Sequence, residues 1–272
     1  MEFLNTSLNI VRESGEMLID GIKSSFNVDR KESKFDLVTE WDKKIESFIT
    51  EKIQDAFPNH KIIGEESIYS EGSQSFEELL RSEPHLWVLD PIDGTNNYIH
   101  RLPGYTISLA MISYGEIKLG IIYNPDNDEM FCAEYGKGAF LNGERLHVSD
   151  RSVLAESMLA TGFPADVDVD RKAVLNQINE LGPLCRNIRV FGSAALHCAY
   201  VAAGRLEAYW EPGLNIWDIA AGALIVQEAN GSVSEMDGSP FILDFKSFMC
   251  GNGVMDNVII HHLNKVASKE MG

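Results

Sequence analysis

The chain of 272 residues is 44% hydrophobic and 24% charged, which gives a globular protein enough apolar material for one large domain or two smaller ones. Its formal net charge of −18 repels the phosphates of nucleic acids and of anionic membranes, and so argues against both as partners. The four cysteines form no CxxC pair, no charged-then-apolar leader opens the chain and no apolar run reaches membrane-spanning length, which together predict a cytoplasmic protein.

The N-terminal part is predicted to begin with helices. Apolar residues at three- and four-residue steps predict an amphipathic helix over residues 2–24. A charged, exposed loop over 27–34 and a short strand over 35–38 follow it. Thr39 and Asp42 resemble a capping box and so predict the start of a second helix, although Asp42 alone is also a first-turn acid favoured by the helix dipole.

A series of short apolar segments separated by turn residues comes after the second helix. They predict strands over 61–64, 86–89, 105–112, 118–123, 129–134 and 139–141. Because short turns connect the later strands, we expect an antiparallel meander. A polar stretch over 67–84, with a short helix near 76–80, interrupts the series.

Near residue 150 the pattern changes to alternating strands and helices. Strands are predicted over 158–161, 187–191 and 206–210, and helices over 171–181, 192–203 and 216–228. This alternation is typical of an α/β unit. We therefore expect an α+β part over 1–150, with an antiparallel sheet, packed tightly against an α/β part over 151–272.

The most informative stretch is Asp90-Pro91-Ile92-Asp93-Gly94-Thr95, directly after the apolar strand at 86–89. Two carboxylates this close repel each other unless a cation lies between them or one keeps a proton. Carboxylate oxygens, together with the Ile92 carbonyl, suit Mg²⁺, and Gly94 and Thr95 can offer N–H groups and a hydroxyl to an anion. The motif alone leaves open a simpler strand-to-helix turn in which Asp90 and Asp93 only cap.

Two further acids stand at the ends of predicted elements. Glu65 follows the strand at 61–64, and Asp218 enters the apolar helix at 216–228. Together with Asp90 and Asp93 they suffice for two divalent ions, which catalyse phosphoryl transfer when they lie ~3.5–4 Å apart. The motifs of P-loop nucleotide hydrolases, zinc proteases and serine hydrolases are missing from the sequence.

Three segments together resemble the signature motifs of the inositol monophosphatase family, and they occur in the family's order. They are Gly64-Glu65-Glu66-Ser67, Asp90-Pro91-Ile92-Asp93-Gly94-Thr95 and Trp217-Asp218-Ile219-Ala220-Ala221-Gly222. The resemblance implies a layered αβαβα sandwich, dependence on two or three Mg²⁺ ions, inhibition by lithium and a homodimer.

By position, the resemblance assigns a role to each of these residues. Glu65, Asp90 and the Ile92 carbonyl would hold a first metal, and Asp90, Asp93 and Asp218 a second, while Glu65 would also reach a third ion through water. The attacking water would be oriented by Thr95 and Asp42. Substrate contacts would come from Asp93, Gly94, Thr95, Ser193, Ala194, Glu211 and Asp218, and Lys34 would lie in the family's mobile catalytic loop.

The expected activity is hydrolysis of a small polyol or sugar phosphate by metal-activated water, with inositol monophosphate first by resemblance. Alternatives within the family are fructose bisphosphate, histidinol phosphate, a phosphorylated nucleotide and the phosphate of NADP, and the basic side chains of Arg171, Arg186 and Arg189 would admit a more anionic substrate. Two other classes stay open: a non-catalytic regulator that binds metal or phosphate, and a structural domain stabilised by Ca²⁺. The expected partners are a small phosphorylated metabolite and a second copy of the chain, without nucleic acid or membrane.

Overall fold

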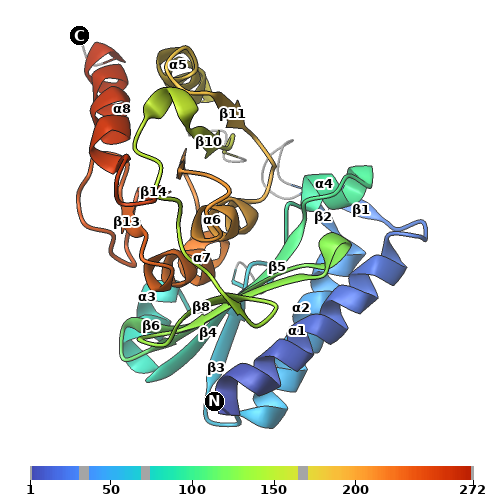
Figure 1. The fold of residues 1–272 in the computed structure, drawn as a ribbon. Coiled ribbons are helices and arrows are strands. Elements are labelled where there is room, and N and C mark those ends of the chain that lie inside the picture. Colours follow the sequence, from blue (N-terminus) through green and yellow to red (C-terminus); the bar gives the residue numbers. More distant parts are fainter. Residues whose placement is uncertain (1, 31–36, 69–73, 165–170, 271–272) are drawn as a thin grey trace.

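The structure, a computed structural model, describes residues 2–30, 37–68, 74–164 and 171–270 (Figure 1). Its helices are α1 Glu2–Gly21, α2 Glu40–Ala56, α3 Phe76–Ser82, α4 Thr95–His100, α5 Arg171–Leu181, α6 Ala194–Ala202, α7 Ile216–Glu228 and α8 Asp256–Glu270. Its strands are β1 Val28–Arg30, β2 Leu37–Thr39, β3 Lys61–Gly64, β4 His85–Asp93, β5 Thr106–Ser113, β6 Glu116–Asn124, β7 Glu129–Glu134, β8 Gly138–Leu141, β9 Glu144–Arg145, β10 Met158–Thr161, β11 Asn187–Arg189, β12 Ala208–Pro212, β13 Ser232–Ser234 and β14 Ser247–Gly251.

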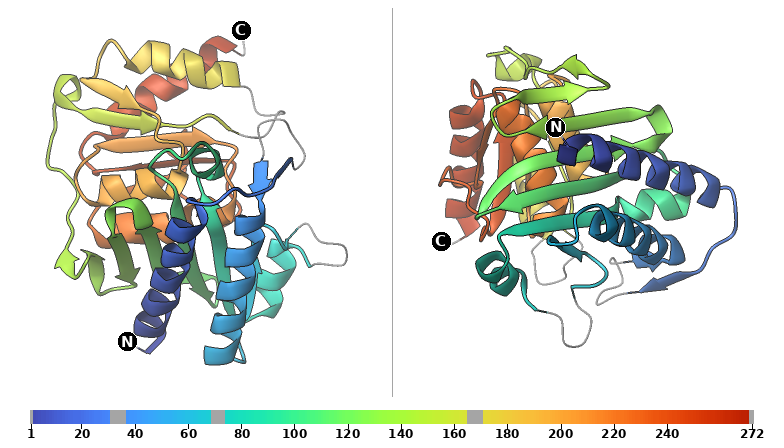
Figure 2. Two further views of the ribbon diagram at one scale, coloured as in Figure 1. Left: turned by 90° about the vertical axis from the view of Figure 1, so that its right-hand side faces the viewer. Right: turned by 90° about the horizontal axis from the view of Figure 1, so that it is seen from below.

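Five layers alternate between helices and sheets, which confirms the predicted αβαβα sandwich (Figure 1). Helices α1 and α2 lie side by side on the outer face of the seven-stranded sheet (Figure 2). Its other face packs on α6 and α7, which also cover the five-stranded sheet. Helices α5 and α8 cover the outer face of that second sheet.

Side chains alternate between the two faces of a sheet along each strand, which explains how both sheets are buried on two faces. Trp87 and Val88 are neighbours in β4, yet Trp87 packs in the core beneath α1 and α2, and Val88 in the core beneath α6 and α7. In β12, Tyr209 faces that central core and Trp210 faces α5 and α8. Successive side chains of a strand point to opposite faces, so each strand contributes to two cores.

The predicted meander is confirmed in the first sheet. Its order is β3-β4-β5-β6-β7-β8-β9, and every neighbouring pair from β4 onward is antiparallel. The second sheet is mixed, because β10 runs parallel to β11 and β12, while β14 is antiparallel to β12 and β13. Each sheet draws its strands from one of the two predicted parts, and the division of the chain at about residue 150 remains a prediction.

Two sequence-based expectations about local structure were wrong. Part of the charged loop expected at 27–34 forms β1, which pairs antiparallel with β2. The strand expected to stop at Leu89 continues through both acids of the central motif to Asp93, with an irregular register between Asp90 and Asp93. Backbone pairing with β5 overrides the turn tendency of Pro91, because a register irregularity tolerates a proline in a strand.

Small residues allow α7 to lie close to the first sheet. A Cβ atom at Gly120 of β6 would stand 2.7 Å from the carbonyl oxygen of Ala221, and one at Gly222 would stand 2.4 Å from the Cβ of Cys198 in α6. Glycine permits such backbone approach because it carries no side chain. This approach brings Asp218, in the first turn of α7, towards the acids of β4.

Among the described residues, no helix combines the length and apolarity needed to cross a membrane.

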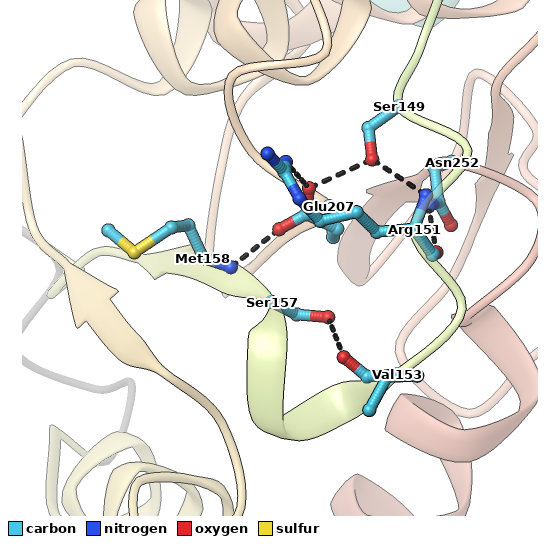
Figure 3. A network of polar contacts seen from close by, with 7 residues as sticks. All are labelled: Ser149, Arg151, Val153, Ser157, Met158, Glu207 and Asn252. Atoms are coloured by element: carbon cyan, nitrogen blue, oxygen red, sulfur yellow. Dashed lines mark hydrogen bonds and ion pairs between the residues drawn. The ribbon is translucent and has the colours of Figure 1, made fainter.

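A polar network joins the connection between the two sheets to the second sheet (Figure 3). The fully buried carboxylate of Glu207 accepts hydrogen bonds from Ser149 Oγ at 2.9 Å, Arg151 Nη1 at 2.8 Å and the Met158 N–H at 2.5 Å. Asn252 donates its backbone N–H to the Glu207 carbonyl at 3.0 Å and its side-chain amide to the Arg151 carbonyl at 2.9 Å. One carboxylate therefore fastens the connecting segment to both β10 and β12.

We predict that Glu207→Ala lowers the free energy of unfolding by about 2–3 kcal/mol, because it leaves the partly buried Met158 N–H and Ser149 hydroxyl without their acceptor. Urea unfolding at neutral pH measures the effect. Glu116→Ala is the matched control, since Glu116 pairs with Lys118 at the surface with 64% of its side chain exposed, and such pairs contribute less than about 1 kcal/mol. Equal losses for the two variants would contradict the role of Glu207.

Candidate active site

The predicted acids gather where β4 ends and where α4, α6 and α7 begin. Asp93 is the last residue of β4, Gly94 precedes the first turn of α4, and Asp218 lies in the first turn of α7. Ser108 of β5 donates its hydroxyl to the Trp217 carbonyl at 3.0 Å, which attaches the start of α7 to the first sheet. Residues far apart in sequence thus converge on one edge of the seven-stranded sheet.

Asp93 is bound by the first turn of α6. Its Oδ2 accepts from the Ala195 N–H at 2.6 Å and from Ser193 Oγ at 2.7 Å, and its Oδ1 accepts from the Ala194 N–H at 3.3 Å. Burial raises the pKa of Asp93 to about 6; the three hydrogen bonds oppose that rise, and the nearby charge of Glu65 adds to it. In this arrangement the Ser193 hydroxyl and the Ala194 N–H donate hydrogen bonds to Asp93. The predicted contact of these two residues with a substrate remains a prediction.

Asp218 and Asp90 are held by backbone donors. The Asn215 N–H donates to Asp218 Oδ2 at 2.6 Å, and the Ile92 N–H donates to Asp90 Oδ1 at 3.0 Å. Burial raises the pKa of Asp218 well above its usual range, and the charges of Asp93 and Glu65 raise it further. Like charges buried together are destabilising, so this group of acids favours a cation among them.

The donor set fits Mg²⁺ in its chemistry, because Glu65, Asp90, Asp93, Asp218 and the Ile92 carbonyl offer only hard oxygen atoms. In the part of the chain that the structure describes, no three acid, histidine or cysteine side chains converge as they would around an ion. Asp93 accepts hydrogen bonds from Ser193 and the first turn of α6, and Asp218 accepts from the N-cap backbone of its own helix. The assignment of these five residues as metal ligands remains a prediction.

Thr95 and Asp42 lie in direct contact. Thr95 Oγ1 is 3.1 Å from Asp42 Oδ1 and 2.9 Å from the Ile92 carbonyl oxygen. The other oxygen of Asp42 accepts from the backbone N–H and the hydroxyl of Thr39 at 2.7 and 2.6 Å, which confirms the predicted capping box of α2. Asp42 therefore both caps a helix and reaches the central motif, so neither sequence-based interpretation excludes the other.

Backbone conformation and one amide side chain keep the start of α4 in place. Gly94 has a φ of +92°, and a Cβ atom there would lie 3.0 Å from the Gly192 carbonyl and 3.1 Å from the Gly104 carbonyl. Asn97 donates its amide to the carbonyl oxygens of Gly104 and Phe191 at 2.8 and 2.7 Å. Sequence reasoning missed Asn97, because nothing local to it indicates that these two distant segments meet.

Glu211 lies on β12, and the residue is 7% exposed. Its Oε2 accepts from the Tyr209 hydroxyl at 2.7 Å, and a Cβ atom at Gly162 would stand 1.8 Å from that oxygen. Burial raises the pKa of Glu211 from 4.5 to about 7; the Tyr209 hydrogen bond and the charge of Arg171 oppose this, and the charge of Asp93 adds to it. Sequence reasoning assigned no role to Tyr209 or to Gly162. Lys34, expected in a mobile catalytic loop, lies outside the described residues.

Comparison with known proteins identifies relatives along the whole chain. Residues 1–268 match the sequence profile described as the inositol monophosphatase family. Fructose-1,6-bisphosphatase/inositol-1-monophosphatase of Thermotoga maritima is 37% identical over 269 residues, which cover 99% of this chain and 98% of the relative. Nus factor SuhB of Pseudomonas aeruginosa is 41% identical over 253 residues, which cover 92% of this chain and 91% of the relative. The solved structure of a Thermotoga maritima IMPase superposes with a TM-score of 0.89 at 36% identity and covers 100% of both chains.

We predict that Glu211 makes the metal-free protein less stable as pH rises from 5 to 8. Its raised folded-state pKa means that the stability it contributes is complete below about pH 4.5 and is lost as pH rises through about 7. Over this range Glu211→Gln should therefore gain stability over the wild type, by on the order of 3 kcal/mol at pH 8. Urea unfolding in the presence of a chelator measures the gain.

The matched control for this measurement is Glu116→Gln, which changes an exposed carboxylate. Its stability should follow that of the wild type across the whole range. If the free energy of unfolding of Glu211→Gln differs from that of the wild type by the same amount at every pH from 5 to 8, the prediction is contradicted.

Proposed function

Because the chain belongs to the inositol monophosphatase family, we propose that it is a Mg²⁺-dependent phosphomonoesterase of small polyol phosphates, with inositol monophosphate as the first candidate. Membership supports phosphatase activity and dependence on metal. The observation that carries the proposal is the concentration of buried acids at the end of β4, next to Thr95 and Asp42. Glu211 supplies the argument for a substrate rich in hydroxyl groups.

In this proposal, two or three Mg²⁺ ions are held by Glu65, Asp90, Asp93, Asp218 and the Ile92 carbonyl. When bound, the metal supplies a Lewis acid that neutralises the charge of the phosphate and lowers the pKa of water. Burial and neighbouring carboxylates raise the pKa values of Asp93 and Asp218, and a cation bound between them would stabilise their ionised forms. Burial of the acids also keeps competing water away from them.

Thr95 and Asp42 orient the attacking water. The Thr95 hydroxyl donates a hydrogen bond to Asp42, which leaves a lone pair of the Thr95 oxygen to accept a hydrogen bond from the attacking water. Thr39 fixes Asp42 from the other side, so the acceptor is positioned before the substrate arrives. The backbone N–H groups of Gly94 and Thr95 are proposed to receive phosphate oxygens at the start of α4.

Glu211 selects the alcohol part of the substrate. A carboxylate accepts hydrogen bonds from hydroxyl groups and repels a second phosphate, which favours inositol monophosphate over a bisphosphate. Fructose bisphosphate is the main alternative, because the Thermotoga maritima relative carries both activities in its name. The charge of Arg171, which acts on Glu211, would partly offset the repulsion of a second phosphate.

A regulator is the second candidate function, and the resemblance to Nus factor SuhB favours it. A protein that only binds metal or phosphate has no need for the hydrogen-bonded pair of Thr95 and Asp42, and neither has a structural Ca²⁺ domain. The pair therefore supports an enzyme. A second copy of the chain as partner and a cytoplasmic location remain predictions.

Asp93→Asn tests the metal assignment. The change removes one ligand charge and replaces one of the two acceptor oxygens by an amide NH2, while the other oxygen still accepts from the first turn of α6. We therefore expect kcat to fall about a thousandfold at saturating Mg²⁺, with the secondary structure retained by circular dichroism. Asp126→Asn is the matched control, because Asp126 accepts a hydrogen bond from Tyr105 at 3.0 Å and has no place in the proposed mechanism. Turnover by Asp93→Asn at the wild-type rate would contradict the assignment of Asp93 as a metal ligand.

Phosphate release from a panel of compounds tests the reaction and ranks the substrates. The panel contains inositol 1-phosphate, fructose 1,6-bisphosphate, histidinol phosphate, a nucleoside monophosphate and NADP, each assayed with and without Mg²⁺ and with lithium. We expect Mg²⁺-dependent, lithium-sensitive release that is fastest with inositol 1-phosphate. Absence of release from every compound, with Mg²⁺ bound by calorimetry, would instead support the regulator.

A further inference from the structure

Tyr209 and Glu211 lie two residues apart on one face of β12 and contact each other through their polar ends. The Tyr209 hydroxyl donates to Glu211 Oε2 at 2.7 Å, and Tyr209 is fully buried. Hydrogen bonds to a charged acceptor are the strong ones, and this bond lies in a dry, low-dielectric environment. The contact therefore restricts how the carboxylate can rotate.

The ring of Tyr209 has little freedom of its own. It packs on the His197 ring with centroids 4.5 Å apart and on Phe248 at 6.1 Å. His197 is fixed in turn, because the Phe191 N–H donates to its Nε2 at 3.0 Å. Burial lowers the pKa of His197 to about 3, so it remains a neutral acceptor and a constant support for the tyrosine.

The backbone of Gly162 lies against the same carboxylate. A Cβ atom at this position would lie 1.8 Å from Glu211 Oε2, so any larger residue would displace the carboxylate. Gly162 is itself positioned by its neighbour Thr161, which pairs with Trp210 and donates its hydroxyl to the Trp210 carbonyl at 2.8 Å. The glycine backbone and the tyrosine hydroxyl together confine one oxygen of Glu211.

We propose that Tyr209 is a positioning residue that fixes the Glu211 carboxylate for recognition of the hydroxyl groups of the substrate. This inference rests on the proposed function, in which Glu211 accepts hydrogen bonds from the alcohol part of a polyol phosphate. With Oε2 held by Tyr209, Oε1 is the oxygen that we propose accepts hydrogen bonds from the substrate hydroxyls. A pre-oriented acceptor loses less conformational entropy on binding and so increases the preference for hydroxyl-bearing substrates.

Tyr209→Phe removes the hydroxyl and keeps the ring that packs on His197 and Phe248. The ratio of kcat/KM for inositol 1-phosphate to kcat/KM for p-nitrophenyl phosphate, which has no sugar hydroxyls, is the measured quantity. We expect the ratio to fall about tenfold, mainly through the KM for inositol 1-phosphate, as for loss of one hydrogen bond to a charged group. Tyr123→Phe is the matched control: Tyr123 is buried and donates to Asp128 at 2.9 Å, and its variant should keep the wild-type ratio.

A double-mutant cycle separates positioning from a merely structural role. If Tyr209 acts through Glu211, Tyr209→Phe changes the ratio in the wild type but not in Glu211→Gln. Equal losses on both substrates, or a full additional effect in Glu211→Gln, would overturn the inference. Calorimetric affinities for inositol 1-phosphate and inorganic phosphate provide the same comparison without turnover.

The failure of this inference can be distinguished from the failure of the proposed function. If the wild type does not prefer inositol 1-phosphate in either assay, or Glu211→Gln leaves the preference unchanged, the hydroxyl role of Glu211 is wrong, and the inference falls with it. If Glu211→Gln reduces the preference and Tyr209→Phe does not, only the role of Tyr209 is wrong.

Discussion

The attachment of Asp93 to the first turn of α6 joins the first sheet to the helical layer behind it and sets the geometry of the candidate active site. Asp93 ends a strand of the first sheet, while its donors, Ser193, Ala194 and Ala195, belong to the helical layer between the sheets. A carboxylate at a helix N-terminus is stabilised by the N–H groups of the first turn. The same contact positions an acid of the candidate active site and joins two layers, so chemistry and packing depend on one side chain.

The surrounding layers make that contact possible by close packing of small residues. Gly120 and Gly222 let α7 approach both the first sheet and α6, and this brings Asp218 to the same place as Asp93. The interior that results excludes water from several like charges, which raises the pKa values of Asp93, Asp218 and Glu211. Three apolar cores supply the free energy that offsets this electrostatic strain.

The signature motifs are local signals, so they predicted the family and, through the resemblance, the layered architecture, and both are confirmed. The helix over 216–228 was predicted at its observed bounds, since its apolar run is long and uninterrupted. Two of the elements that were missed are the short strand β13 and the C-terminal helix α8, where polar residues interrupt the pattern. The partners of Asp93 could not be predicted, because they lie about a hundred residues away and no local pattern encodes that distance. Tyr209 was missed for a related reason: alternation places it on the same face as Glu211, but only the fold shows that this face is buried.

The order of strands has a consequence for synthesis of the chain. All strands of the seven-stranded sheet lie between Lys61 and Arg145, so this sheet can form while the ribosome is still translating the remainder. The helices that cover its inner face, α6 and α7, are made only at residues 194–228, and β14 of the second sheet only at 247–251. Until then an apolar sheet surface remains exposed, and partly folded chains of this kind are prone to aggregate. Slow translation or a high rate of expression would therefore be expected to make this protein dependent on chaperones during its biogenesis.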